Sequence, residues 1–210
     1  MINIKKKIVV CIIISIIWIY TGNQAILFTG TDVQMFDLMK IILFNPQKLL
    51  FNNILCFTLY LYISIIDIYR IEDVIRRKGR ILVDQIRIGC GVVLEYSLLL
   101  CTSIIIPLAK NLPINEKNIS IFIVCFFKSF VINYMIYAVF LFIGLLVNRG
   151  ISFFILIVLS LITLICWNMF DYYYDLCNNF VITQNVVVQI IIILIATVGC
   201  HMLLENKEYY

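Results

Sequence analysis

The chain has 210 residues, of which 63% are hydrophobic and only 13% are charged, and its formal net charge is +4. With a mean hydropathy of +1.06, this composition excludes a soluble globular domain, because such a domain could not bury so much apolar surface. A bilayer core about 30 Å thick requires roughly 20 apolar residues per helix, and the apolar runs meet that length repeatedly. The sequence therefore predicts an all-α polytopic membrane protein that forms one transmembrane domain over residues 1–210.

The first predicted span covers about residues 8–28. Lys5, Lys6 and Lys7 precede it, as the basic segment of a signal peptide would, but no small-residue cleavage site follows the apolar run. Residues 30–48 mix apolar and charged side chains and predict a short amphipathic helix at the outer interface. The second span is expected at about 49–69.

The most charged part of the sequence, residues 70–87, reads RIEDVIRRKGRILVDQIR and cannot lie in lipid. Its apolar residues recur at helical spacing, and Gly79 interrupts the pattern, so we expect one or two short amphipathic helices. We expect an apolar face with charged residues around it. The apolar members are Val74, Ile75 and Leu82, and the charged ones are Glu72, Arg76, Arg77 and Arg80.

Four further apolar runs predict the remaining spans, for a bundle of six helices in total. Their expected bounds are about 88–109, 119–147, 151–170 and 186–204. Pro107 is expected to end the third span, because proline cannot donate the backbone hydrogen bond that continues a helix.

The distribution of positive charge predicts the orientation. With a cytoplasmic amino terminus, Lys5 to Lys7, the segment 70–87 and Arg149 all face the cytoplasm, whereas Asp171 and Asp175 face outwards. Both termini are then cytoplasmic, and the chain is a multi-pass protein of the cell membrane.

Catalytic motifs are missing from the sequence. It has a single histidine, His201, and none of the motifs HExxH, GxSxG, Walker A or GxGxxG. The eight cysteines are spread singly through apolar runs, which is typical of packing residues rather than of metal ligands. We therefore expect no enzyme activity and no cofactor in this chain, and no nucleic-acid partner.

Two charged residues fall inside predicted spans: Glu95 in the third and Lys128 in the fourth. Such residues usually point into a bundle. They are interpreted either as a polar pathway or substrate contact, or as an ion pair that fixes helix register, with Lys128 alternatively reaching outward. Asn133 would extend the same polar patch.

The segment IEDVIRRKGR, at residues 71–80, is similar to a charged stretch found between spans two and three in small permeases linked to bacteriocin or antimicrobial-peptide export and immunity. The six-span arrangement resembles that of permease subunits of ABC-2-type transporters. This resemblance implies a cytoplasmic coupling helix that docks on a separate ATPase, which would hold ATP and Mg²⁺, and a second permease copy or paralogue. The implied function is movement of a peptide or other amphipathic substrate across the membrane.

Other interpretations stay open at this point. The basic segment is equally suited to binding lipid phosphates. The chain is alternatively a stand-alone sensor or immunity protein that binds a peptide in the membrane, or an intramembrane peptidase.

Overall fold

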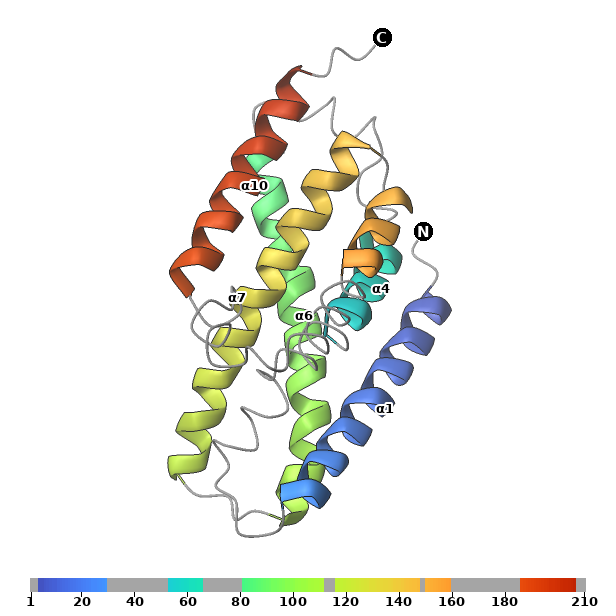
Figure 1. Cartoon of the computed structure of the whole chain (residues 1–210), viewed down its shortest axis with the longest axis vertical. Coiled ribbons are helices and arrows are strands. Elements are labelled where there is room, and N and C mark those ends of the chain that lie inside the picture. Colours follow the sequence, from blue (N-terminus) through green and yellow to red (C-terminus); the bar gives the residue numbers. More distant parts are fainter. Residues whose placement is uncertain are drawn as a thin grey trace, which may run out of the picture.

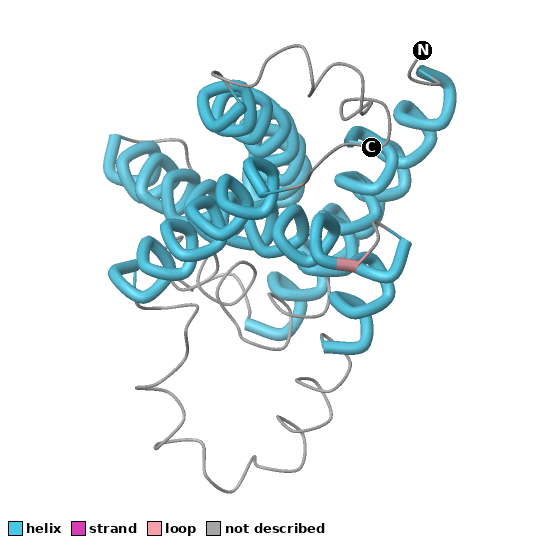
Figure 2. The backbone as a smooth tube through the Cα atoms, turned by 90° about the horizontal axis from the view of Figure 1, so that it is seen from above, coloured by secondary structure: helices cyan, strands magenta, loops and turns pink. Residues whose placement is uncertain are grey.

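The computed structural model describes residues 4–29, 53–65, 81–111, 116–147, 150–159 and 186–206, and within these ranges the elements are all helices (Figures 1 and 2). The all-helical prediction is therefore confirmed for the described part of the chain. The helices are α1 (Ile4–Thr29), α4 (Ile54–Ile65), α6 (Ile81–Asn111), α7 (Glu116–Leu146) and α10 (Val186–Asn206), together with a short helix over Gly150–Leu159.

Four of these helices, α1, α6, α7 and α10, are long and apolar enough to cross a membrane. They coincide with the predicted spans 8–28, 88–109, 119–147 and 186–204. The two shorter apolar helices, α4 and Gly150–Leu159, lie within the predicted spans 49–69 and 151–170, whose remaining residues lie outside the described ranges.

The helix α6 differs from its predicted bounds at both ends. It begins at Ile81, so the charged residues Asp84 and Arg87 lie on the same helix as the apolar span. At the other end the expectation that Pro107 ends the helix is wrong, because α6 runs through this proline to Asn111. Proline is tolerated inside membrane helices where neighbouring helices accommodate it.

A glycine on α1 accommodates Pro107. A methyl group on Gly22 would lie 2.6 Å from the Cγ atom of Pro107, so only glycine allows this close approach. Nearer the amino end of α1, Lys7 meets Glu95 of α6. Both contacts follow the same order along the two helices, so α1 and α6 run in the same direction (Figure 1).

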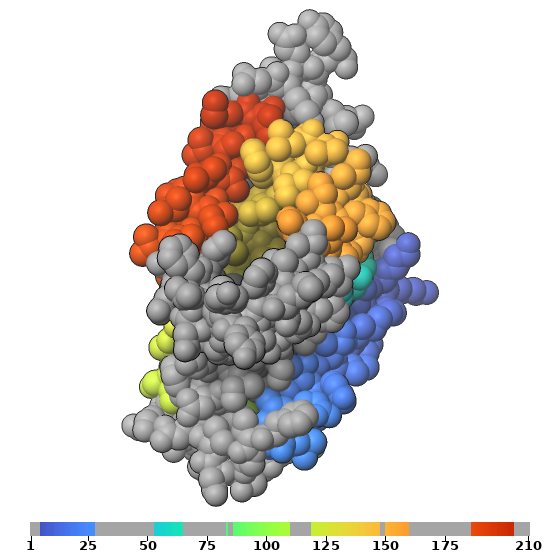
Figure 3. All heavy atoms as spheres, in the orientation of Figure 1, coloured from blue at the N-terminus to red at the C-terminus, as the bar shows by residue number. Residues whose placement is uncertain are grey.

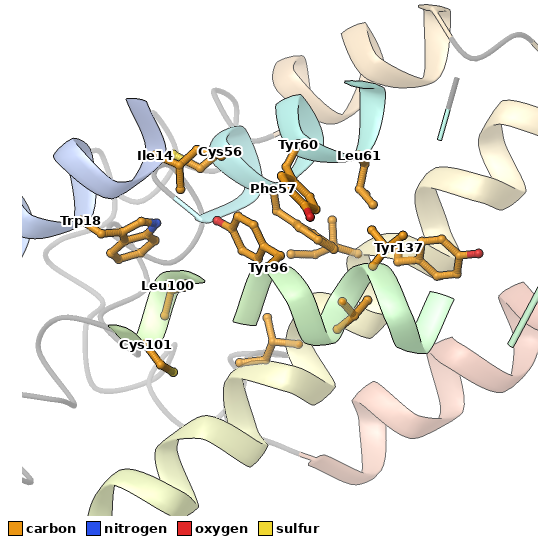
Figure 4. Packing of buried hydrophobic residues seen from close by; sticks show 14 of the residues in the cluster. Ile14, Trp18, Cys56, Phe57, Tyr60, Leu61, Tyr96, Leu100, Cys101 and Tyr137 are labelled. Carbon is orange, nitrogen blue, oxygen red and sulfur yellow. The ribbon is translucent and has the colours of Figure 1, made fainter. Parts of the chain in front are cut away.

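The core lies where α6 packs against α1, α4 and α7. Its largest fully buried side chains include Trp18, Phe57, Tyr60 and Tyr96, which come from three different helices (Figure 4). The helices α1 and α10 lie on opposite flanks of the face shown in Figure 3. Most of their exposed residues are Ile, Val and Leu, as lipid-facing surfaces require.

Candidate functional site

A lysine, a tyrosine and a glutamate from three helices form what we call the charged cluster: Lys7 of α1, Tyr60 of α4 and Glu95 of α6. The Lys7 Nζ atom lies 2.6 Å from Glu95 Oε2, and the Tyr60 hydroxyl donates a 2.7 Å hydrogen bond to the same oxygen. The Lys7 ammonium also lies 5.6 Å from the centre of the Tyr60 ring, within range of a cation–π contact. One carboxylate oxygen thus joins α1, α4 and α6.

The charged cluster is only partly covered by protein. The side chain of Glu95 is 56% exposed and that of Lys7 is 30% exposed, whereas Tyr60 is buried. The other carboxylate oxygen, Glu95 Oε1, accepts no hydrogen bond from any residue in the described ranges. The cluster therefore has a closed side, towards Tyr60, and an open side.

A second polar group, which we call the asparagine network, lies in the interior between α4, α6 and α7. It consists of Asn53, Tyr96, Ser97, Ser129 and Asn133, each buried. Asn53 Nδ2 donates to Asn133 Oδ1 at 2.8 Å, and the Tyr96 hydroxyl donates to Asn53 Oδ1 at 3.1 Å. Asn133 Nδ2 donates to Ser97 Oγ at 3.0 Å and to Ser129 Oγ at 3.4 Å. Hydrogen bonds of this kind hold membrane helices together.

Helical periodicity explains why α4 serves both groups. Asn53 directly precedes α4, and Asn53, Phe57 and Tyr60 are separated by four and three residues, so they lie on one face, and all three are buried. The ring of Tyr96 lies 4.5 Å from that of Phe57 and 5.5 Å from that of Tyr60, measured between centroids. Tyr60 and Tyr96 therefore connect the charged cluster to the asparagine network.

Trp18 completes this region from the side of α1. It is fully buried, and its indole nitrogen points towards the hydroxyl of Tyr96 (Figure 4). Tyr96 of α6 thus lies close to Trp18 of α1 (Figure 4) and packs against Phe57 of α4. Its hydroxyl is linked through Asn53 to Asn133 of α7. Tyr96 therefore lies at the centre of the polar region.

A shallow apolar groove runs along α1 beside the charged cluster. Its volume is about 490 Å³, and Lys7 lies at one end of it. The other residues that line it are Ile8, Cys11, Ile12, Ser15, Ile16 and Leu99. The groove opens to the outside of the bundle rather than to its interior.

The three intramembrane residues singled out from the sequence lie in different surroundings. Asn133 is fully buried at the centre of the asparagine network. Glu95 forms its ion pair with Lys7 of α1, so the pairing considered with Lys128 does not occur. Lys128 lies on an exposed part of α7 next to Phe127, which is 62% exposed.

Most of the predicted coupling segment lies outside the described residues. This applies to Glu72, Val74, Ile75, Arg76, Arg77 and Arg80, as well as to the expected outer helix at 30–48 and the outer loop at 171–179. Leu82 is described as part of the first turn of α6. It lies on the same continuous helix as Glu95 and Tyr96.

Sequence analysis missed Asn53, Tyr60 and the role of Lys7. Asn53 and its neighbour Asn52 stand near the expected start of a span, where polar residues are ordinary. In the sequence Lys7 indicates only the orientation of the first span, because the relative depth of two parallel helices is not encoded in either one alone. The available signal was an unpaired intramembrane Glu95, since such a charge requires a partner.

The site carries no evident metal or redox centre in the described ranges. No three His, Cys, Asp or Glu residues gather there, and the six cysteines in those ranges are free thiols. What the described site offers is therefore hydrogen bonding, one ion pair and apolar contact.

No protein-family model, no curated protein and no solved structure matches this chain.

Proposed function

We propose that this chain is the permease subunit of an ABC transporter of the cell membrane. It would move a peptide or other amphipathic substrate, while a separate ATPase subunit hydrolyses ATP. The observation that carries this proposal is the connected polar region, where Glu95 and Asn133 hold four helices together. Polar groups buried inside a helical bundle, as Asn133 is, are expensive, and they commonly mark a transport pathway.

The direction of the helices supports a six-span topology with both termini in the cytoplasm. The helices α1 and α6 run one way, whereas α7 and α10 both run the other way (Figure 1). Two helices that cross a membrane in the same direction require a segment between them in the sequence that crosses back. The shorter helices α4 and Gly150–Leu159 lie at the corresponding positions of the sequence.

The continuity of α6 supports the coupling role of the cytoplasmic segment. Leu82 and Glu95 lie on one unbroken helix, about 20 Å apart along its axis at a rise of 1.5 Å per residue. A movement imposed at Leu82 by a docked ATPase would therefore be transmitted to the charged cluster and to Tyr96. In this proposal Val74, Ile75 and Leu82 form the docking face, and Arg76, Arg77 and Arg80 surround it.

Copurification tests the proposal. A tagged chain should retain an ATPase subunit from its own cells, and its substrate should stimulate ATP hydrolysis in nanodiscs. Ile75→Asp would place an unpaired charge in the contact, so we expect assembly to fall at least tenfold while membrane insertion continues. Asp73→Asn, on the same segment, is the matched control and should assemble normally. If the wild-type chain retains no ATPase, the transporter proposal is wrong and a peptide-binding membrane protein takes its place.

A further inference from the structure

Lys7 belongs both to the charged cluster and to the groove, so the groove adjoins the cluster. At one end lie an ammonium group, Lys7, and a carboxylate, Glu95, whose Oε1 atom accepts no hydrogen bond from the described residues. From there the groove extends along α1 past Ile8 and Ile12 to Ile16. This surface has a zwitterionic end and an apolar body.

The dimensions of the groove match one leaflet of a bilayer. From Lys7 to Ile16 is about 13.5 Å along the axis of α1, at a rise of 1.5 Å per residue. Half of a hydrocarbon core about 30 Å thick is roughly 15 Å. In the orientation expected from the lysines, the zwitterionic end lies on the cytoplasmic side.

We propose that this groove binds a phospholipid of the cytoplasmic leaflet whose headgroup carries both a phosphate and a primary ammonium. The phosphate would contact Lys7, and the ammonium would donate a hydrogen bond to Glu95 Oε1. One acyl chain would lie against Ile8, Ile12 and Ile16. The inference does not depend on the transport proposal, because it uses no ATPase and no transported substrate.

The charges on this face favour such a headgroup over others. A purely anionic headgroup would satisfy Lys7 but would face the half-exposed carboxylate of Glu95. A quaternary ammonium has no N–H group, so it cannot donate to Oε1, whereas a primary ammonium has three. A charge-assisted hydrogen bond of this kind is strong enough to change affinity about tenfold. Lys5 and Lys6, both exposed at the same end of α1, add positive charge near Lys7.

Native mass spectrometry of the delipidated protein tests the proposal. Dioleoylphosphatidylethanolamine and dioleoylphosphatidylcholine have identical chains, so their comparison isolates the headgroup. We expect the wild-type protein to bind the ethanolamine lipid about tenfold more tightly. Glu95→Gln should reduce that preference to less than about twofold. Lys128→Gln, which removes a charge elsewhere in the spans, should leave it at about tenfold.

A second variant keeps the test valid if Glu95→Gln disturbs folding. Ser15→Trp fills the groove two turns away from Lys7, and it should weaken the binding of both lipids, whereas Phe127→Trp on α7 should weaken neither. Equal binding of the two lipids by the wild-type protein would overturn the proposal. It would also be overturned if Glu95→Gln kept the wild-type preference while Ser15→Trp kept the wild-type affinity for both lipids. A lipid-free dimer that Glu95→Gln separated would overturn it as well. That last result would assign the groove to a second copy of the chain.

Discussion

The two sides of α6 differ sharply, although they are only one or two residues apart in the sequence. Tyr96 and Ser97 are fully buried, and both belong to the asparagine network. Glu95, the preceding residue, has a side chain that is 56% exposed. The buried side fixes how α4, α6 and α7 pack, whereas the open side leaves a charged group exposed. A single helical turn thus combines a packed side with an open one.

The same contrast holds one turn earlier, at two glycines. A Cβ atom on Gly89 would meet the ring of Tyr137 on α7, whereas nothing lies within 4 Å of the corresponding position on Gly91. The buried side of α6 therefore needs a small residue for close helix packing, as membrane helices often do. The open side imposes no such demand at Gly91.

The largest effect on stability is expected at the centre of the buried side. Asn133→Leu removes the bonds to Asn53, Ser97 and Ser129, and it leaves a buried amide donor unpaired. We expect a loss of about 2 kcal/mol in the free energy of unfolding, measured by denaturation in mixed micelles. Asn23→Leu, at an exposed position of α1, should change the free energy little. Equal effects of the two substitutions would show that the network does not stabilise the bundle.

Substitution of the two glycines by alanine is expected to change the free energy of unfolding by a smaller amount, with opposite sign at Gly89 and Gly91. Gly89→Ala should lower the free energy of unfolding by about 1 kcal/mol, because the Tyr137 ring must move to admit the methyl group. Gly91→Ala should raise it by about 0.5–1 kcal/mol, since alanine favours a helix over glycine and meets open space here. The same denaturation assay compares them, and stabilisation by Gly89→Ala would contradict the packing described.

Sequence reasoning found the long helices because length and apolarity alone define them. The predicted spans 8–28 and 119–147 differ from α1 and α7 by only a few residues at each end. It failed where a neighbouring helix decides the outcome. Pro107 continues α6 because Gly22 of another helix leaves room for its ring.

The polar site was predicted only in part for the same reason. Glu95 and Asn133 stood out because charged and amide side chains are rare within spans. The partners of Glu95 were not predictable from spacing, since Lys7 and Tyr60 lie 88 and 35 residues away from it. Their contact depends on how deeply α1 and α4 sit beside α6, which is a property of the packed bundle.

The contrast between the two sides of α6 is tested most directly by oxidative cross-linking in native membranes. In a background without the native cysteines, one variant carries Ser97→Cys with Asn133→Cys, and the other carries Glu95→Cys with Asn133→Cys. A protease site between α6 and α7 lets a non-reducing gel report whether the two fragments stay joined. Ser97 and Asn133 are joined by a 3.0 Å hydrogen bond, so we expect the first pair to cross-link efficiently and the second to stay separate. Efficient cross-linking of the Glu95 pair, with none for the Ser97 pair, would contradict the assignment of the buried and open sides.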